Sequence, residues 1–301
     1  MKHLITIIFV LFSIQTQAQN VTICDSLTKS PISFANVIID EAGQYSDGNG
    51  NIYYADTIKK INITHVNYYT KQIINPKALD TIFLNPKITE LKEVIVTSDR
   101  IPMKIGFLKK DKYLRNLPVT PKYELIIKIT PNTANYNLKI DEIFIPLYSS
   151  HELFKKGMEN NPKTGICRVN IYKEIANDEL EMIYQSDIIK FLMSERDQIL
   201  LDLRNETIKL DPEGLYISVE MIGSIDDYGI INTVHAHIRP GLTSETSKDY
   251  MASTYSKRAF DNKPSKLASI SNIMNEYFTK IYKNYTERNF NIAIGLVVSK
   301  E

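Results

Sequence analysis

Short apolar runs separated by turn residues constrain the fold of this chain more than any other feature. Between residues 21 and 97, seven such runs follow one another, and each is shorter than a typical helix. Within one of them, Ile61 and Ile63 flank the polar Asn62, the period of two that places alternate side chains on opposite faces of a strand. Seven short strands joined by turns predict a small β-sandwich.

One of the turns in this region lies at residues 47–50. Its sequence is Asp-Gly-Asn-Gly, and both Gly and Asn accept the positive φ angles that tight turns need. The pattern of a calcium-binding loop, which ends in a bidentate Glu, is absent from the sequence at this point. We therefore expect a β-hairpin turn in preference to a calcium site.

Longer apolar runs continue the strand pattern in residues 122–301. Leu138 and Ile140 alternate with Lys139, and Pro212-Glu213-Gly214 provides a turn between two later runs. A helical spacing then gives one apolar face to Leu267, Ile270, Ile273, Met274, Tyr277, Phe278, Ile281 and Tyr282. The fold class predicted for the whole chain is mainly β, with two β-sandwiches and a late amphipathic helix in the second.

The first 18 residues have the pattern of a secretory signal peptide. Lys2 and His3 precede an apolar run at residues 4–14, and the small Thr16 and Ala18 lie just before a cleavage site after Ala18. The run is too short to span a bilayer, and no later run is long enough either. We expect an exported protein with no transmembrane segment in its mature chain, located in the periplasm, at the outer membrane or outside the cell.

Charge and cysteine content say little about a partner. The 36 Lys and Arg residues balance 35 Asp and Glu residues, so nothing in the composition points to nucleic acid as a partner. Export permits disulfides, but the 2 cysteines, Cys24 and Cys167, fall in different predicted domains. We expect two buried apolar side chains, and the sequence leaves open whether they pair.

Several motifs follow one another in residues 20–98. They are Pro31-Ile32, Ala35-Asn36-Val37, the turn at residues 47–50, and Val66-Asn67-Tyr68. In these motifs the region resembles the carboxypeptidase-regulatory-like domain, a transthyretin-like sandwich found in exported bacterial proteins, although Ser30 stands where a Gly commonly precedes the Pro. The resemblance implies a non-catalytic scaffold or binding accessory with seven strands, and it transfers no active-site residue.

A second resemblance covers residues 135–224. The run of strands there is similar to a jelly-roll-like domain of unassigned function that follows such regulatory domains in secreted bacterial proteins. Met221-Ile222 stands where that family typically has a Trp. The predicted organisation is a signal peptide at residues 1–18, the first sandwich at 19–98, a linker at 99–121 and a jelly-roll-like sandwich at 122–301.

Few residues suggest chemistry. His235 and His237 have the i, i+2 spacing that places two imidazoles on one face of a strand. They could begin a zinc site with His151 or His65 as a third ligand, although an exposed polar strand explains them as well. The adjacent carboxylates Asp226-Asp227 are explained by turn initiation. We therefore predict no catalytic residue, no cofactor and no metal, with His235 and His237 as the metal candidates that the sequence offers.

Tyrosines are the remaining hint at function, because an exposed ring offers a flat surface for proteins or sugars. The candidates are Tyr53, Tyr54, Tyr68, Tyr69, Tyr148, Tyr250, Tyr255 and Tyr285, for which core packing is the other explanation. We expect an exported, non-catalytic binding or scaffold module of the cell envelope, whose partner is a cell-surface protein or a glycan. The alternative is a secreted enzyme or enzyme accessory, a glycan hydrolase or peptidase, with its site in residues 122–301. The oligomeric state stays open.

Overall fold

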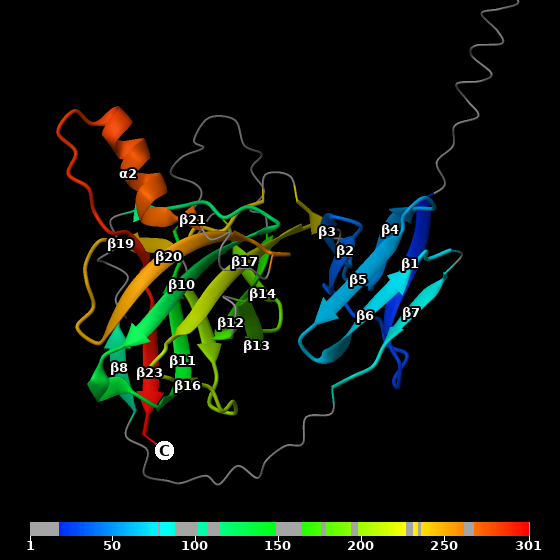
Figure 1. The fold of residues 1–301 in the computed structure, drawn as a ribbon, viewed down its shortest axis with the longest axis horizontal. Helices are drawn as coiled ribbons and strands as arrows, with labels where there is room; N and C mark the ends of the chain where they lie inside the picture. Colours follow the sequence, from blue (N-terminus) through cyan, green and yellow to red (C-terminus); the bar gives the residue numbers. More distant parts are fainter. Residues whose placement is uncertain are drawn as a thin grey trace, which may run out of the picture. The chain divides into compact units, whose positions relative to one another are not determined.

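The computed structural model describes residues 18–77, 79–87, 102–107, 115–148, 164–175, 179–193, 198–226, 231–233, 236–261 and 268–300. The chain divides into two compact units, Met1–Thr89 and Glu90–Glu301 (Figure 1). Strands dominate both units, so the predicted mainly-β class is confirmed. Most of the predicted signal peptide and the end of the predicted first sandwich lie outside the described residues. No helix among the described residues is long and apolar enough to cross a membrane.

The first unit consists, in its described residues, of two sheets. Their strands are β1 (Ala18–Asp25), β2 (Asn36–Ile39), β3 (Ala42–Tyr45), β4 (Asn51–Ala55), β5 (Lys60–His65), β6 (Tyr68–Ile74) and β7 (Thr81–Leu84). One sheet has the order β4-β1-β7, in which β1 is antiparallel to β4 and parallel to β7. The other has the order β3-β2-β5-β6 and is antiparallel throughout.

Residues of both sheets form a single buried apolar cluster in the first unit. Val21 and Ile23 of β1 belong to it together with Ile61 and Ile63 of β5, and all four are fully buried. Asn62, between the two isoleucines, is only half-buried, so the predicted alternation of this strand is confirmed. The two sheets are thus held together by the apolar faces that their strands share.

The turn at residues 47–50 connects β3 to β4, which belong to different sheets. Oδ1 of Asp47 accepts hydrogen bonds from the backbone N–H groups of Asn49 at 2.8 Å and Asn51 at 2.7 Å. The predicted hairpin is therefore wrong, because the turn carries the chain from one sheet to the other. Asp, Asn and Gly favour both kinds of turn, and the local sequence does not record which strand the following segment will pair with.

Replacing Gly50 by Ala should destabilise the first unit. Gly50 has a φ of +79°, and a Cβ there would lie 2.7 Å from the carbonyl oxygen of Ile23. Backbone strain and this clash together should cost about 1–3 kcal/mol of unfolding free energy, measured by denaturant unfolding. The matched control is Gly48→Ala, because a Cβ at Gly48 would meet nothing within 4 Å. Equal losses of stability in the two variants would contradict this explanation of the turn.

The largest sheet of the second unit follows the order β13-β12-β17-β10-β20-β21. Two short strands extend it, because β14 also pairs with β12 and β18 with β17. The bounds of its described strands are β10 Tyr123–Pro131, β12 Thr164–Ile175, β13 Glu179–Gln185, β14 Ile189–Leu192, β17 Leu215–Ile225, β18 Ile231–Asn232, β20 Tyr250–Arg258 and β21 Ala268–Ser269.

Two smaller sheets complete the described part of the second unit. One joins β8 (Met103–Gly106), β11 (Leu138–Pro146), β15 (Gln198–Asp202), β16 (Lys209–Leu210) and β23 (Gly295–Ser299), in the order β15-β11-β23-β8 with β16 beside β11. The other has the order β22-β19-β9 and joins β9 (Arg115–Asn116), β19 (Gly241–Thr243) and β22 (Asn291–Ile292). A short 3₁₀ turn, η2 (Thr133–Asn135), precedes β11.

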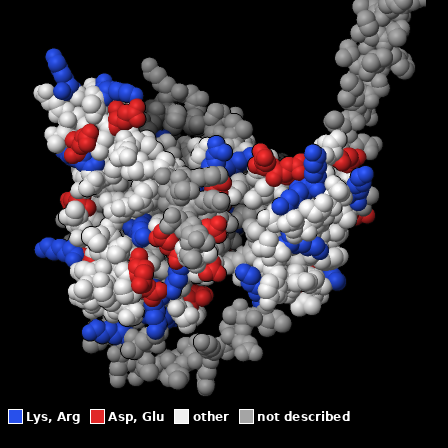
Figure 2. All heavy atoms as spheres, viewed as in Figure 1, with Lys and Arg blue, Asp and Glu red and all other residues white. Residues whose placement is uncertain are grey.

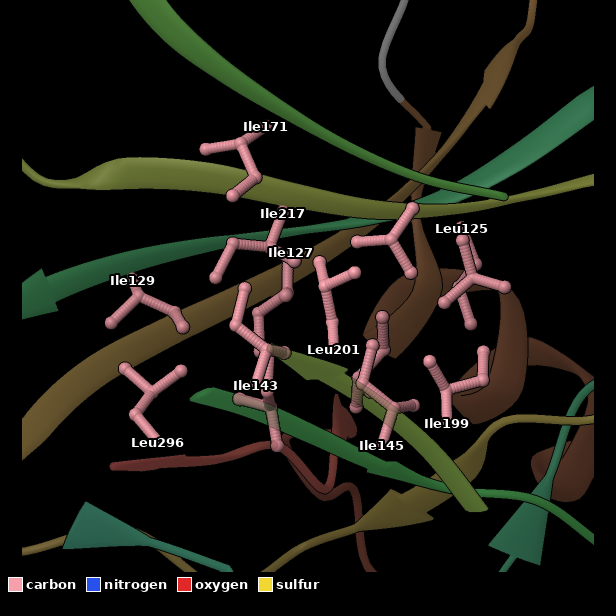
Figure 3. Close-up of a cluster of buried hydrophobic side chains, with 14 of the residues drawn as sticks. Leu125, Ile127, Ile129, Ile143, Ile145, Ile171, Ile199, Leu201, Ile217 and Leu296 are labelled. Atoms are coloured by element: carbon pink, nitrogen blue, oxygen red, sulfur yellow. The ribbon is translucent and has the colours of Figure 1, made fainter. Parts of the chain in front are cut away.

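The main core of the second unit lies where the two larger sheets face each other. Figure 3 shows Ile127 of β10 and Ile217 of β17 opposite Ile143 of β11. All three are fully buried, as alternation along each strand requires for residues that point inward. The intervening residues of β10, β12 and β17 therefore point to the other face of the largest sheet.

The helix α2 (Ile270–Ile281) packs against this core through Ile270, Met274 and Phe278. It begins after Ser269, whose side chain accepts a hydrogen bond from the backbone N–H of Asn272. The predicted amphipathic helix is thus confirmed for the residues that the structure describes. In Figure 1 it lies beside β20 and β21, the strands that precede it in the chain.

The linker predicted at residues 99–121 is wrong in its described parts. β8 pairs with β23 and β9 pairs with β19, so both strands belong to sheets of the second unit. Ile105 of β8 is buried in the main core, but its neighbour Lys104 is exposed. A four-residue strand with one buried residue, set in a basic stretch, leaves too little periodicity to be recognised.

Candidate functional site

The face of the largest sheet that points away from the main core carries four charged residues side by side. Strand pairing aligns Lys257 of β20 with Glu124 of β10. It also aligns Glu124 with Glu220 of β17, and Glu220 with Arg168 of β12. We call these four residues the charge row. Each of them is exposed by 2% or less, so the charge row is fully buried.

Each carboxylate of the charge row has a cation beside it. Nε of Arg168 donates to Oε2 of Glu220 at 2.6 Å, and its Nη2 donates to Oε1 at 3.1 Å. Nζ of Lys257 donates to Oε1 of Glu124 at 2.9 Å. Two carboxylates directly opposite each other on neighbouring strands repel, and the flanking cations offset that repulsion. The row is neutral as a whole, which lowers the cost of burying its charges.

Neutral side chains complete the hydrogen bonding of the charge row. The hydroxyl of Tyr172 donates to Oε2 of Glu124 at 2.8 Å, and Nδ2 of Asn170 donates to Oε2 of Glu220 at 2.8 Å. Burial, followed by the negative charge of Glu124, raises the pKa of Tyr172 well above its usual value. Tyr172 therefore remains a protonated donor near neutral pH and does not act as a base.

The geometry of the charge row is unsuited to acid–base catalysis. Glu124 also lines a small pocket of about 190 Å³, yet its two oxygens accept from Lys257 and Tyr172. Glu220 is fully buried and is held by Arg168. A general acid or base must come within hydrogen-bonding reach of a substrate, and these groups are already engaged. The row instead fixes the register of the sheet, because a shift by one residue would turn its charges into the main core.

Replacing Lys257 by Met should destabilise the second unit by about 3–5 kcal/mol, because it leaves the Glu124 carboxylate buried without its cation. Denaturant unfolding measures this change. The control is Lys280→Met in α2, where the pair with Glu276 has both side chains 71% exposed and solvent already screens the charges. That control should unfold like the wild type. Equal losses of unfolding free energy in the two variants would show that burial does not determine how strongly the Lys257–Glu124 pair stabilises the unit.

The metal candidates are not brought together in the described residues. His237 is half-buried near the bridge between Val119 and Ile238, whereas His235 and His151 lie outside the described residues. His65 belongs to the first unit, where its Nδ1 accepts from the backbone N–H of Asn67 at 3.2 Å. No cluster of three metal-ligating side chains occurs within the described ranges.

Asp226 of the adjacent carboxylate pair follows β17, and its neighbour Asp227 is outside the described residues.

Cys24 and Cys167 are both buried, and neither forms a disulfide. Burial, reinforced by the negative charge of Glu220, raises the pKa of the Cys167 thiol. The thiolate is the reactive form of cysteine, so the raised pKa makes Cys167 a poor nucleophile. The expectation of two buried side chains agrees with this environment.

Cys167 should resist alkylation by iodoacetamide in the native protein at pH 8, because its thiol is protonated and inaccessible. Mass spectrometry of peptides after alkylation, with and without denaturant, measures the modified fraction. A Thr70→Cys variant supplies an exposed reference thiol on β6. Reaction of native Cys167 at the rate of the reference thiol would contradict its assignment as a buried core residue.

A pocket of about 420 Å³ lies where the chain leaves α2. Its described lining residues are Phe278, Tyr282, Asn284, Tyr285, Thr286, Arg288 and Phe290. We call it the aromatic pocket, and its volume lies in the range of about 300–1,000 Å³ that is typical of ligand sites. In Figure 2, charged side chains of both signs lie around α2 at the upper left, with uncharged surface between them.

Phe278 joins the aromatic pocket to the main core, because it belongs to both. The ring centroids of Tyr285 and Tyr282 lie 5.3 and 5.8 Å from that of Phe278. The ring of Phe290 lies at 6.0 Å. Such separations are favourable for aromatic pairs. The pocket thus has a floor anchored in the core, above which the 51% exposed Tyr282 presents its ring to solvent.

Two side chains of α2 fasten the segment that forms the rest of the pocket. Oδ1 of Asn275 accepts from the hydroxyl of Tyr285 at 2.7 Å and from the backbone N–H of Arg288 at 3.0 Å. One turn earlier, Oγ of Ser271 accepts from the backbone N–H of Phe290 at 2.9 Å. These bonds hold the segment against the helix at two points, so the pocket is formed before any ligand arrives.

Polar groups lie at the exposed side of the aromatic pocket. Asn284 and Thr286 offer an amide and a hydroxyl, and both residues are exposed. Arg288 is the one described lining residue that carries a charge. Aromatic rings beside a few hydrogen-bonding groups can pack against the apolar faces of a small ligand and orient its polar groups.

An exposed apolar stripe runs along α2 next to the aromatic pocket. It consists of Ile273, Tyr277 and Ile281, which are spaced four residues apart and lie on one side of the helix. All three are exposed, so the apolar arc of α2 is wider than the part that the core covers. The core therefore covers only part of the apolar face that the sequence predicted for this helix.

The predicted tyrosine candidates have different environments. Tyr53 and Tyr69 are exposed, Tyr54 and Tyr250 are buried, and Tyr68, Tyr148, Tyr255 and Tyr285 are half-buried. The aromatic pocket brings Tyr285 together with Tyr282 and Phe278, which sequence reasoning had assigned to the helix face alone. No sequence pattern marked Asn284, Thr286 and Arg288 as site residues, because their segment shows neither helix nor strand periodicity.

Comparison of the chain with models of known protein families finds no match, and neither does comparison with curated proteins. The function is therefore inferred from the residues of this chain. Among the described features, the charge row is closed to ligands and the aromatic pocket is open to them.

Proposed function

We propose that this chain is an exported, non-catalytic binding module of the cell envelope that binds glycans through the aromatic pocket. The observation that carries the proposal is the pocket itself, in which the exposed ring of Tyr282 stands above a floor anchored by Phe278. The apolar face of a sugar packs on such a ring, and its hydroxyl groups need hydrogen-bonding partners. The pocket offers both kinds of contact.

The two units have different roles in this proposal. The first unit is a scaffold of the carboxypeptidase-regulatory-like type, which is supported by its motifs and by the two sheets packed around one core. The second unit is a β-sandwich of jelly-roll-like type, as the resemblance of residues 135–224 suggests, and it carries the binding site. The signal-peptide pattern of residues 1–18 supports export to the periplasm, the outer membrane or the cell exterior.

The alternative, a secreted glycan hydrolase or peptidase, has less support. A glycan hydrolase typically places two carboxyl groups about 5–10 Å apart on either side of the bond that it cleaves. The carboxylates of the charge row are buried and ion-paired. The described lining of the aromatic pocket includes no Asp, Glu, His or Cys. Binding without cleavage therefore fits the described residues better than hydrolysis.

Replacing Tyr282 by Ala should weaken glycan binding at least about tenfold, or about 1.4 kcal/mol, because it removes the exposed ring from the pocket. The mature chain from Gln19 onward would first be screened on a glycan array. Isothermal titration calorimetry with a retained polysaccharide then measures the affinity of each variant, and circular dichroism confirms that each is folded.

The matched control is Tyr277→Ala, which removes a tyrosine of α2 that is 58% exposed but does not line the pocket. This control should bind like the wild type. Loss of binding in Tyr277→Ala but not in Tyr282→Ala would move the site to the apolar stripe of α2. Retention of a cell-surface protein without any glycan, or cleavage of a retained glycan, would refute the proposed function.

A further inference from the structure

Arg288 gives the aromatic pocket a positive charge that no described carboxylate neutralises. None of the described lining residues is acidic, and no described Asp or Glu pairs with the guanidinium. The nearby Lys280 differs in this respect, because its Nζ lies 2.7 Å from Oε1 of Glu276 on the same helix. Arg288 therefore gives the described pocket lining a positive charge without a described acidic partner.

The backbone of Arg288 is held in place before any ligand binds. Asn275 accepts from its N–H group at 3.0 Å and donates to its carbonyl oxygen at 3.0 Å. The same Oδ1 of Asn275 accepts from the hydroxyl of Tyr285 at 2.7 Å. One side chain of α2 thus fixes the backbone of Arg288 and the hydroxyl of Tyr285 relative to each other. Such preorganisation lowers the entropy cost of binding.

A guanidinium group has a planar fork of donors that matches the two oxygens of a carboxylate. A sugar with a carboxylate presents an apolar ring face and an anionic group within one residue, which are the two features that the ring of Tyr282 and the fork of Arg288 complement. We infer that the aromatic pocket takes an acidic sugar, with Arg288 binding its carboxylate and Tyr282 packing against its ring. This inference rests on the proposed glycan binding and adds the charge of the ligand.

The test compares three polysaccharides by calorimetry on the mature full-length chain. Polygalacturonate carries carboxylates, dextran sulfate carries sulfate esters and dextran is neutral. Wild-type protein should bind polygalacturonate at least about tenfold more tightly than dextran, because a charge-assisted pair is added to the stacking contact. Dextran sulfate distinguishes a carboxylate site from one that accepts any anion.

The decisive variant is Arg288→Gln, which keeps a hydrogen-bonding side chain but removes the charge. It should bind polygalacturonate no more tightly than the wild type binds dextran. The matched control is Lys283→Gln, which removes an exposed cation close by in the chain that is not part of the described pocket lining, and it should keep the wild-type preference. Arg288 is exposed, so both variants should fold like the wild type, as circular dichroism would show.

The outcomes separate the inference from the proposed function. Equal wild-type affinities for dextran and polygalacturonate, both weakened by Tyr282→Ala, would overturn the acidic-sugar inference and leave glycan binding in place. Tighter binding of dextran sulfate than of polygalacturonate would overturn the assignment of a carboxylate. A preference for polygalacturonate that survives in Arg288→Gln would overturn the role of Arg288. Binding of none of these polymers would overturn the inference, while the glycan array decides the proposed function independently.

Discussion

Packing of Phe278 into the main core is the contact on which the aromatic pocket depends. The same ring belongs to the core cluster of the second unit and to the pocket lining. Burying a side chain of this size contributes roughly 1.5–3 kcal/mol, so the forces that fold the unit also hold α2 and the base of the pocket in place. The segment that follows α2 has no regular secondary structure between residues 282 and 290, yet Asn275 and Ser271 tie it to the helix. A loop fastened in this way can present exposed groups in fixed positions.

The charge row and Arg288, both in the second unit, differ in what their charges can do. Those of the charge row are buried, mutually neutralised and hydrogen-bonded by Tyr172 and Asn170, so they specify how four strands align. The charge of Arg288 is exposed and has no described acidic partner. A buried charge that is already paired gains nothing from a ligand, whereas an exposed guanidinium at the edge of a formed pocket can still form its strongest hydrogen bonds. The proposed function therefore uses the exposed charge of Arg288 and not the buried charge row.

The features that the sequence predicted are those that depend on neighbours a few residues apart. Alternation around Asn62 identified β5, and the spacing of Ile270, Met274 and Phe278 identified α2. Features that depend on distant partners were missed. Arg168 and Glu220 are 52 positions apart, and Glu124 and Lys257 are 133 apart, so strand order alone brings them together. The strand β8 was missed because it has four residues, of which Ile105 alone is buried, and so shows too little periodicity. The pocket was missed because Asn275 and Arg288 meet across an irregular segment.

The central claim is that the aromatic pocket binds an acidic glycan, and nuclear magnetic resonance tests it most directly. Isotopically labelled mature protein would be titrated with a short oligogalacturonate while backbone and side-chain amide signals are followed. The predicted result is saturable shifts of the backbone signals of Asn284, Thr286 and Arg288 and of the side-chain amide of Asn275, with the first unit unchanged. Shifts confined to the first unit, or no shifts in the segment from residue 282 to 290, would contradict the claim.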